Sequence, residues 1–572
     1  MNLNENLKEL LTKSLSSAYP ELSSYELNFE HPADLAHGDF ACNVALALSK
    51  ELKQNPRQIA EKILENLPKS KFISKAEIAG PGFINFFLSQ EFLNEELADI
   101  LDKAGKYGIS KIGKKEKVIL EYSSPNTNKP QHVGHLRNNL LGLSLIKILE
   151  ANSFQVKTAC VFNDRGMGVS KAMVAYEEFA QGKTPKSENK KPDHFVGDMY
   201  VMFQQKLAEH PELEQAVKEN LEKWEAGDKA TIDLWKKMRD WVLEGYQETY
   251  ARLGIKFDLE NFESDIYMRG KKIVEDGLQQ GVFYKKEDGS VWIDLRDEGL
   301  DEKLLLRGNG TAVYMTQDLY LTLDRIKKIG ESRVVFVVAS EQLYHFKVLF
   351  SVFKKLGFKW ADKCFHLAYG MVNMEGAKIK SREGTVLDLD NLMDQMHELA
   401  FAEVQKRYGD LSPEEMHKMA EKVAQGALRY GILKVDAMQD ICFDLKRAVT
   451  FEGNTGPYLQ YTHARICQIL KQETFDPKAS LDSLKETEEE NLLRKLYLYP
   501  EVVEEAAQNY KPSLIANYLY DLATAFNTFY HKHTVLKADE ELKKARLKLI
   551  AATAQVLKNG LELLSIEAPE RM

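Results

Sequence analysis

The chain has 572 residues, of which 44% are hydrophobic and 28% are charged, and its formal net charge is −9. These values are typical of a globular protein of roughly three or four domains. They argue against a general polyanion binder but not against local basic patches, and no apolar run approaches the length of a membrane span.

The N-terminal segment and the cysteines bear on the cellular compartment. MNLNENLKELLTKSL is polar and carries Glu5 and Glu9, which is typical neither of a secretory signal nor of a transit peptide. The five cysteines are scattered without a C-x-x-C pair. This pattern predicts reduced thiols in a cytoplasmic protein, with no zinc site and no disulfide framework.

Residues 1–110 form the first predicted domain. Helical patterns alternate here with the segment AEIAGPGFINFFLS, so we expect a small α+β domain. The Gly- and Lys-rich segment AGKYGISKIGKKEK then marks the boundary to the next domain.

Residues 111–390 alternate strand-like and helical runs, which predicts an α/β domain with a parallel sheet and crossover connections. Residues from about 170 to 260 are mostly helical and polar, and we interpret them as an insertion. VFYKKEDGSVWIDL predicts a hairpin with its turn at Asp288 and Gly289. The strand candidates are KVILEY, KTACVFND, VVFVVAS and FHLAYGMV.

Two histidines stand where the first of these strands gives way to a helix. SSPNTNKPQHVGHLRNNLLG contains His132 and His135 around Gly134. Ligands of open α/β sheets bind at such points, and a helix N-terminus suits a phosphate. Gly134 lacks a Cβ, so a flat base or a ribose can come close to the backbone. Two capping or core histidines are the alternative, and spacing alone does not separate the two interpretations.

A second charged motif, NMEGAKIKSREGT, follows a strand-like run and carries Lys378, Lys380 and Arg382 between Gly376 and Gly384. The glycines and cations indicate a loop that closes on an anion. A solvated charged turn is the alternative, and it is favoured when the motif is taken alone.

Residues 391–572 are almost entirely helical in pattern. In LIANYLYDLATAFNTFYHKH the apolar and aromatic residues recur at helical spacing, which favours core packing over a base-stacking surface. LKKARLKL carries four cations, Lys543, Lys544, Arg546 and Lys548, and a solvated helix face is their ordinary interpretation.

Taken together, the motifs resemble those of class I aminoacyl-tRNA synthetases. HVGH looks like the HIGH motif of that class, and KIKSR looks like its KMSKS loop, with Ser381 where the second lysine would stand. EYSSPNTNKPQHVGHLRN is similar to the extended HIGH region of the arginyl-tRNA synthetase family. Further similarity to this family lies in FEGNTGPYLQYTHARI, LELLSIEAPERM, HGDFACNVALALSK and GPGFINFFLS, so the resemblance spans nearly the whole chain.

The resemblance implies a Rossmann-type catalytic domain at 111–390, a tRNA-contacting domain at 1–110 and a C-terminal anticodon-binding domain within 391–572. In that last domain the four cations of LKKARLKL are candidate tRNA contacts. It implies arginyl transfer to tRNA(Arg) with L-arginine, ATP and Mg²⁺, by a monomer in the cytoplasm, with activation that depends on tRNA. The alternatives are a class I synthetase for another amino acid and a catalytically silent tRNA-binding relative. A nucleotidyltransferase acting on a small coenzyme would not need the helical C-terminal region.

The resemblance also implies roles for individual residues. His132 and His135 would stabilise negative charge at the α-phosphorus, and Gly134 would let the adenosine pack against the backbone. Lys378 and Lys380 would bind the distal phosphates. These are the expected catalytic and ATP-binding residues, and we expect no protein metal ligand.

For the amino acid, the resemblance implies that Asp318, Glu121 and Tyr314 hold the guanidinium, and that Asn126 and Gln342 hold the α-amino and carboxylate end. Tyr314 and Asp318 stand four residues apart, on one face if the segment is helical. From the residues alone, surface acids and a core tyrosine are the favoured interpretation.

Overall fold

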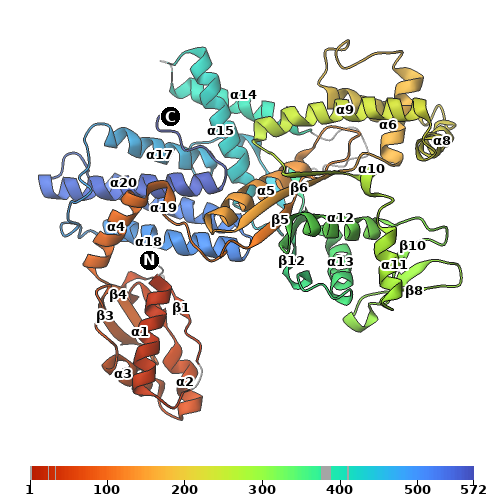
Figure 1. Cartoon of the computed structure of the whole chain (residues 1–572). Coiled ribbons are helices and arrows are strands. Elements are labelled where there is room, and N and C mark those ends of the chain that lie inside the picture. Colours follow the sequence, from red (N-terminus) through yellow and green to blue (C-terminus); the bar gives the residue numbers. More distant parts are fainter. Residues whose placement is uncertain (1–2, 23–24, 33, 375–387, 409–410) are drawn as a thin grey trace.

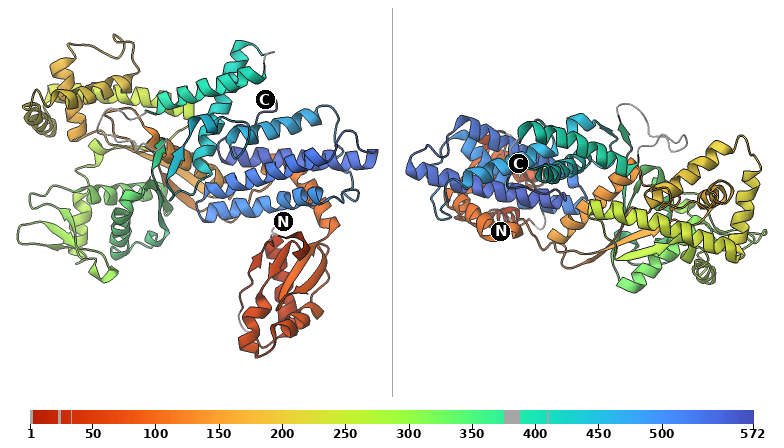
Figure 2. Two further views of the ribbon diagram at one scale, coloured as in Figure 1. Left: turned by 180° about the vertical axis from the view of Figure 1, so that it is seen from behind. Right: turned by 90° about the horizontal axis from the view of Figure 1, so that it is seen from above.

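The computed structural model describes residues 3–22, 25–32, 34–374, 388–408 and 411–572. In Figure 1 a small N-terminal domain projects from a helical C-terminal region, and an α/β body lies beside that region. The view from behind in Figure 2 shows the same arrangement. In the described part of the chain, no helix has both the length and the apolar character to cross a membrane.

The N-terminal domain is an antiparallel sheet of order β1-β2-β4-β3 packed with helices. Leu7, Leu11 and Leu15 repeat at helical spacing on α1 and are fully buried in its core. Asp39 joins this domain to α18 (Thr487–Gln508), because its carboxylate accepts a hydrogen bond from the Tyr497 hydroxyl at 2.9 Å. The elements are α1 (Leu3–Ala18), β1 (Phe29–Glu30), β2 (Phe40–Cys42), α2 (Val44–Leu52), α3 (Pro56–Glu65), β3 (Ile73–Ala79), β4 (Phe83–Leu88) and α4 (Gln90–Lys103).

A parallel sheet of order β12-β11-β5-β6-β7 forms the centre of the body. Three successive residues of β5, Val118, Ile119 and Leu120, are fully buried, as expected for a strand covered on both faces. The four predicted strands all lie in this sheet, whereas β7 was not predicted. The elements are β5 (Lys117–Glu121), α5 (Val133–Ala151), β6 (Gln155–Phe162), β7 (Leu259–Phe262), β11 (Arg333–Ala339) and β12 (Cys364–Tyr369).

Two excursions leave the sheet on opposite sides in Figure 1. The predicted insertion is helical, and the predicted hairpin pairs β8 with β9 around Gly289, whose φ is +82°. The first excursion contains α6 (Met167–Phe179), α7 (Pro192–Lys206), α8 (Leu213–Glu225) and α9 (Lys229–Leu253). The second contains α10 (Glu263–Ile266), α11 (Lys271–Gln279), β8 (Tyr284–Lys285), β9 (Val291–Ile293), β10 (Lys303–Leu306) and α12 (Tyr314–Ile329), whereas α13 (Leu343–Lys355) crosses from β11 to β12.

The C-terminal region is helical, as the pattern predicts, except that β14 pairs in parallel with β13. Phe526 and Phe529 of α19 are fully buried, so core packing of this helix is confirmed. The elements are β13 (Val372–Met374), α14 (Leu389–Arg407), α15 (Pro413–Leu433), β14 (Ile441–Phe443), α16 (Leu445–Ala448), α17 (Gly456–Leu470), α18 (Thr487–Gln508), α19 (Pro512–Lys532) and α20 (Glu540–Leu563).

Two of the four candidate tRNA-contacting cations on α20 are interior residues. Arg546 is 5% exposed and donates to the Glu489 carboxylate at 2.7 Å, and Lys548 is 3% exposed and donates to a backbone carbonyl. Both the tRNA-contact and the solvated-face interpretations are therefore wrong for Arg546 and Lys548. Their environment is decided by partners distant in sequence, which are Glu489 of α18 for Arg546 and the Ala479 carbonyl for Lys548.

Candidate active site

His132 and His135 close the first turn of α5. His132 is the N-cap residue: the Gly134 backbone N–H donates to its Nδ1 at 3.1 Å, and the His132 backbone N–H donates to His135 Nδ1 at 3.1 Å. Because both Nδ1 atoms accept hydrogen bonds, the proton of each neutral ring lies on Nε2. The capping interpretation is thus correct, and it leaves Nε2–H donors for another partner.

Burial keeps both imidazoles neutral. It lowers the pKa of His132 to about 4, with a further contribution from the charge of Lys129. Burial likewise lowers the pKa of His135 well below its ordinary value, helped by His132 and Lys129. Near pH 7 the two rings are therefore hydrogen-bond donors without a net charge.

The structure gives a reason for glycine at position 134 that the sequence did not reveal. A Cβ built at this position would lie 2.9 Å from Cε1 of His132, which is closer than real side chains approach. Any larger residue would therefore displace the His132 ring. Gly134 also lines the cavity described below, so close approach by a ligand stays a prediction.

Side chains at the start of α5 tie the helix to the carboxyl ends of the sheet strands. Asn138 donates to the carbonyl of Val337 in β11 at 2.6 Å. Arg137, fully buried, donates to the carbonyls of Gly370 at 2.8 Å and Asp436 at 3.1 Å. The histidines are therefore positioned where ligands of open α/β sheets bind.

A cavity of about 480 Å³ opens at this edge of the sheet. Asn126 does not line it: the side chain is exposed, and its backbone carbonyl accepts from the Tyr246 hydroxyl. Lys378 and Lys380 lie outside the described residues. The predicted residues that line the cavity are Glu121, His132, Gly134, His135, Tyr314, Asp318 and Gln342.

Asp318 and Tyr314 share the first turns of α12, as the spacing predicted. His345 Nε2 lies 2.7 Å from Oδ2 of Asp318. Burial raises the pKa of Asp318, while His345 opposes that shift. The charge of Asp318 raises the pKa of Tyr314, whose side chain is 58% exposed, so its phenol stays protonated. This wall therefore offers a carboxyl group beside a hydroxyl.

Glu121 is already paired within the protein. Its carboxylate accepts from Nη1 of Arg325, whose side chain is 1% exposed. Arg325 also donates from Nε to Asn261 at 3.0 Å. A second guanidinium at Glu121 would compete with this internal one.

Sequence reasoning missed Glu263, a further acid that lines the cavity. Burial, together with the charges of Asp164 and Asp318, raises its pKa to about 7, although Arg165 opposes the shift. Glu263 directly follows β7, and an acid at the carboxyl end of a sheet strand was the available signal. The shortness of β7 concealed it.

Comparisons with known proteins first define the class. Residues 96–445 match the family described as tRNA synthetases class I (R), catalytic domain. Residues 5–88 match the arginyl tRNA synthetase N terminal domain, and residues 459–572 match the DALR anticodon binding domain. The fold and these matches are those of a class I aminoacyl-tRNA synthetase, and membership of this class implies the use of ATP.

Individual relatives narrow the class. The arginine–tRNA ligase of Treponema denticola is 41% identical, with 99% of each chain covered. That of Parabacteroides distasonis is 40% identical over 99% of this chain and 98% of its own. The solved arginyl-tRNA synthetase of Thermus thermophilus superposes with a TM-score of 0.85 at 27% identity, with both chains fully covered. This chain belongs to the arginyl-tRNA synthetase family, which confirms the predicted fold, family and enzyme class.

Proposed function

We propose that this chain joins L-arginine to tRNA(Arg) in two steps within the described cavity. The arginine carboxylate attacks the α-phosphorus of ATP, giving arginyl-adenylate and releasing pyrophosphate. The 2′-hydroxyl of the terminal tRNA adenosine then attacks the activated carbonyl and releases AMP. The observation that carries the proposal is one cavity with two neutral imidazole donors at a helix N-terminus and the Asp318 carboxylate on its wall.

In this proposal His132 and His135 act as hydrogen-bond donors rather than as bases. Their Nε2–H groups meet phosphate oxygens as negative charge grows at the α-phosphorus, next to the positive end of α5. The substrate carboxylate is itself the nucleophile, so the protein supplies orientation and charge stabilisation.

Asp318 and Glu263 are the proposed partners of the guanidinium, with Tyr314 beside them, and the predicted role of Glu121 stays a prediction. Asp318 contributes to the raised pKa of Glu263, so two acids on one wall repel each other until a cation enters. A planar guanidinium relieves this repulsion and can donate to both acids. Gln342 is the proposed contact of the α-amino and carboxylate end, and the role of Asn126 stays a prediction.

ATP and Mg²⁺ complete the proposed site. Lys378 and Lys380 remain the proposed contacts of the distal phosphates. Among the described residues, the acid and histidine groups close enough to hold an ion are Asp193–His194–Asp390 and Glu486–Glu488–His533, and neither lines the cavity. We propose that Mg²⁺ is held by ATP phosphates and water, where it would neutralise pyrophosphate charge.

We further propose that tRNA contacts both residues 1–110 and the helices within 391–572, flanking a catalytic domain at 111–390. Lys543 and Lys544 remain candidate contacts, although both pair with Glu540. All five cysteines are free, which supports a reducing, cytoplasmic setting. A monomer is the proposed state.

Pyrophosphate exchange tests this function. We expect ATP–pyrophosphate exchange with arginine alone among the twenty amino acids, and only when tRNA(Arg) is present. Canavanine, which keeps the planar fork, should compete with arginine, whereas citrulline, which is neutral, should not. Exchange with a different amino acid would contradict the specificity. Strong exchange without tRNA would contradict only the tRNA dependence.

A further inference from the structure

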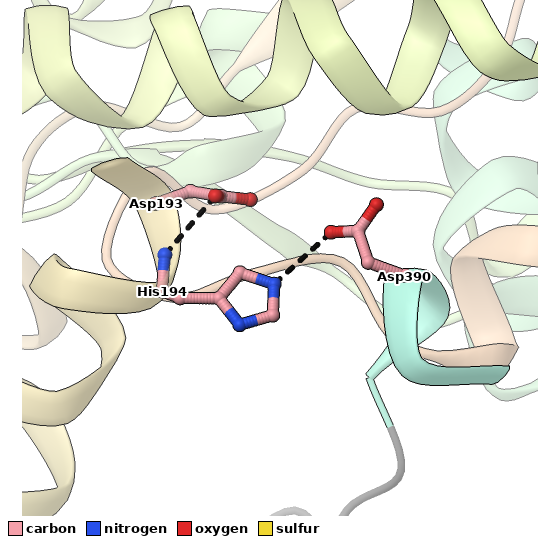
Figure 3. A group of neighbouring side chains, drawn as sticks. All are labelled: Asp193, His194 and Asp390. Atoms are coloured by element: carbon pink, nitrogen blue, oxygen red, sulfur yellow. Dashed lines mark hydrogen bonds and ion pairs between the residues drawn. The ribbon is translucent and has the colours of Figure 1, made fainter. Parts of the chain in front are cut away.

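An ion network lies outside the cavity, between the insertion and the start of α14. Figure 3 shows Asp193 and His194 of α7 facing Asp390 of α14. His194 Nε2 lies 3.0 Å from Oδ2 of Asp390, and the hydroxyl of Thr249 on α9 lies 3.0 Å from Oδ1. The Asp390 carboxylate thus binds side chains of two helices of the insertion, α7 and α9.

Two carboxylates and an imidazole suggest a metal site, but the ammonium group of Lys191 already lies between the two carboxylates. Lys191 Nζ lies 2.7 Å from Asp390, 3.3 Å from Asp193 and 2.5 Å from the Thr249 hydroxyl. Its charge compensates the buried Asp193. The hydrogen bonds from His194 and Lys191 overcome burial and lower the pKa of Asp390 to about 2. The network is therefore complete without an ion.

The same insertion holds the loop that leads to the HVGH motif. The Tyr246 hydroxyl of α9 shares its proton between the carbonyls of Asn126 at 2.8 Å and Lys129 at 2.6 Å. A Cβ on Gly197 of α7 would lie 2.6 Å from Cδ of Pro130. Helices α7 and α9 therefore form one support for this loop.

The first residues of α14 return to that motif. The Leu389 backbone N–H donates to the Gln131 carbonyl at 2.8 Å, and Asp388 is the antiparallel bridge partner of His132. A short path of contacts thus runs from the insertion through Asp390 and Leu389 to His132.

We propose that Asp390 is a positioning residue for amino-acid activation. Lys191 and His194 hold its carboxylate, which fixes the first turn of α14 against Gln131 and His132 and so sets where the His132 ring stands in the cavity. The proposal rests on the proposed role of His132. It extends that role to residues that do not line the cavity.

The test compares Asp390→Asn with Asp394→Asn in the full-length chain, using steady-state aminoacylation. Asp394 is one turn further along α14 and also binds the insertion, through Arg252 of α9 at 2.5 Å. We expect Asp390→Asn to lower kcat about ten- to hundred-fold, because misplacement by about 1 Å has an effect of that order. The KM values for arginine and ATP should stay close to those of the wild-type chain. Asp394→Asn should leave kcat within about two-fold of the wild-type value. Equal losses in both variants would overturn the proposal.

A double-mutant cycle identifies the residue through which Asp390 acts. If it acts through His132, adding Asp390→Asn to His132→Asn should lower kcat no further, whereas independent effects would multiply. Multiplied effects would overturn the proposal. A normal kcat in His132→Asn alone would instead refute the role of His132. Thermal unfolding checks that each variant is folded. If Asp390→Asn unfolds the chain, Lys191→Met takes its place as the test, because it removes a donor to the Asp390 carboxylate and should cause the same loss of kcat.

Discussion

Nε2 of His345 lies 2.7 Å from the Asp318 carboxylate, and both side chains line the cavity. One oxygen of the carboxylate thus has a partner that the sequence did not indicate. His345 also packs near Tyr314, with ring centroids 5.5 Å apart. This wall of the cavity is therefore built by α12 and α13 together before any substrate arrives, which limits the reorganisation needed on binding.

Replacing Asp318 by Asn keeps its size and removes its charge. Losing one member of a desolvated charged pair costs about 3 to 5 kcal/mol, so kcat/KM for arginine should fall by about two to three and a half decades. The KM for ATP should stay near normal. Steady-state kinetics with each substrate varied separately measure both, and Asp324→Asn, on the same helix but paired with Lys328, is the control. Near-normal arginine kinetics in Asp318→Asn would remove Asp318 from the site.

Glu263 predicts a pH dependence of arginine use. Its pKa in the free protein is about 7, above the ordinary 4.5, so the side chain is protonated in mild acid and ionised in mild base. Because a guanidinium prefers the carboxylate form, kcat/KM for arginine should rise as the pH increases through about 7 and then level off. Glu263→Gln should lower the plateau and flatten this rise. An identical pH profile in the variant would exclude Glu263 as its source.

The sequence predicted most of the fold because each element carried a local signal. β5, β6, β11 and β12 are apolar runs, and the turn at Gly289 needs a positive φ that glycine adopts easily. β7 escaped because Leu259–Phe262 is short and half polar. The capping and functional interpretations of HVGH are also compatible, since each imidazole uses one nitrogen for the turn and has another for a ligand.

Partners distant in sequence could not be predicted. Glu121 and Arg325 are 204 positions apart, and nothing local to either residue announces the pair. Arg546 was interpreted as a surface cation because α20 carries lysines around it, yet Glu489 of another helix buries it. Such pairs depend on how helices pack, which a single sequence encodes only through the whole fold.

Arg546→Ala should therefore destabilise the C-terminal region rather than weaken tRNA binding alone. The change leaves Glu489, which is fully buried, without its cation, and this typically costs about 3 to 5 kcal/mol. We expect a loss of stability at the lower end of this range, because backbone N–H groups of Lys485 and Glu486 still donate to the Glu489 carboxylate. Denaturant unfolding followed by far-ultraviolet circular dichroism measures the loss. Lys544→Ala, which removes an exposed i, i+4 partner of Glu540, should change stability by less than about 0.5 kcal/mol.

His132→Asn separates the capping role of His132 from its proposed catalytic role. Asn is among the best N-cap residues, so its carbonyl oxygen should still accept from the first turn of α5 and the fold should persist. The Nε2–H donor is lost, and removing one donor to developing charge lowers kcat by about two to three decades.

The KM values for arginine and ATP should change little, because the lost contact strengthens only as charge develops. Asp539→Asn replaces the N-cap of α20, far from the cavity in sequence and absent from its lining, and it should leave kcat unchanged. The kcat of Gly134→Ala should lie between those of His132→Asn and Asp539→Asn, because a methyl group at position 134 would displace the His132 ring. Since the pKa of His132 is about 4, protonation of this imidazole should not limit the wild-type rate above about pH 5. Single-turnover formation of arginyl-adenylate in the presence of tRNA measures these rates directly, and a normal rate in a folded His132→Asn chain would reduce His132 to a cap.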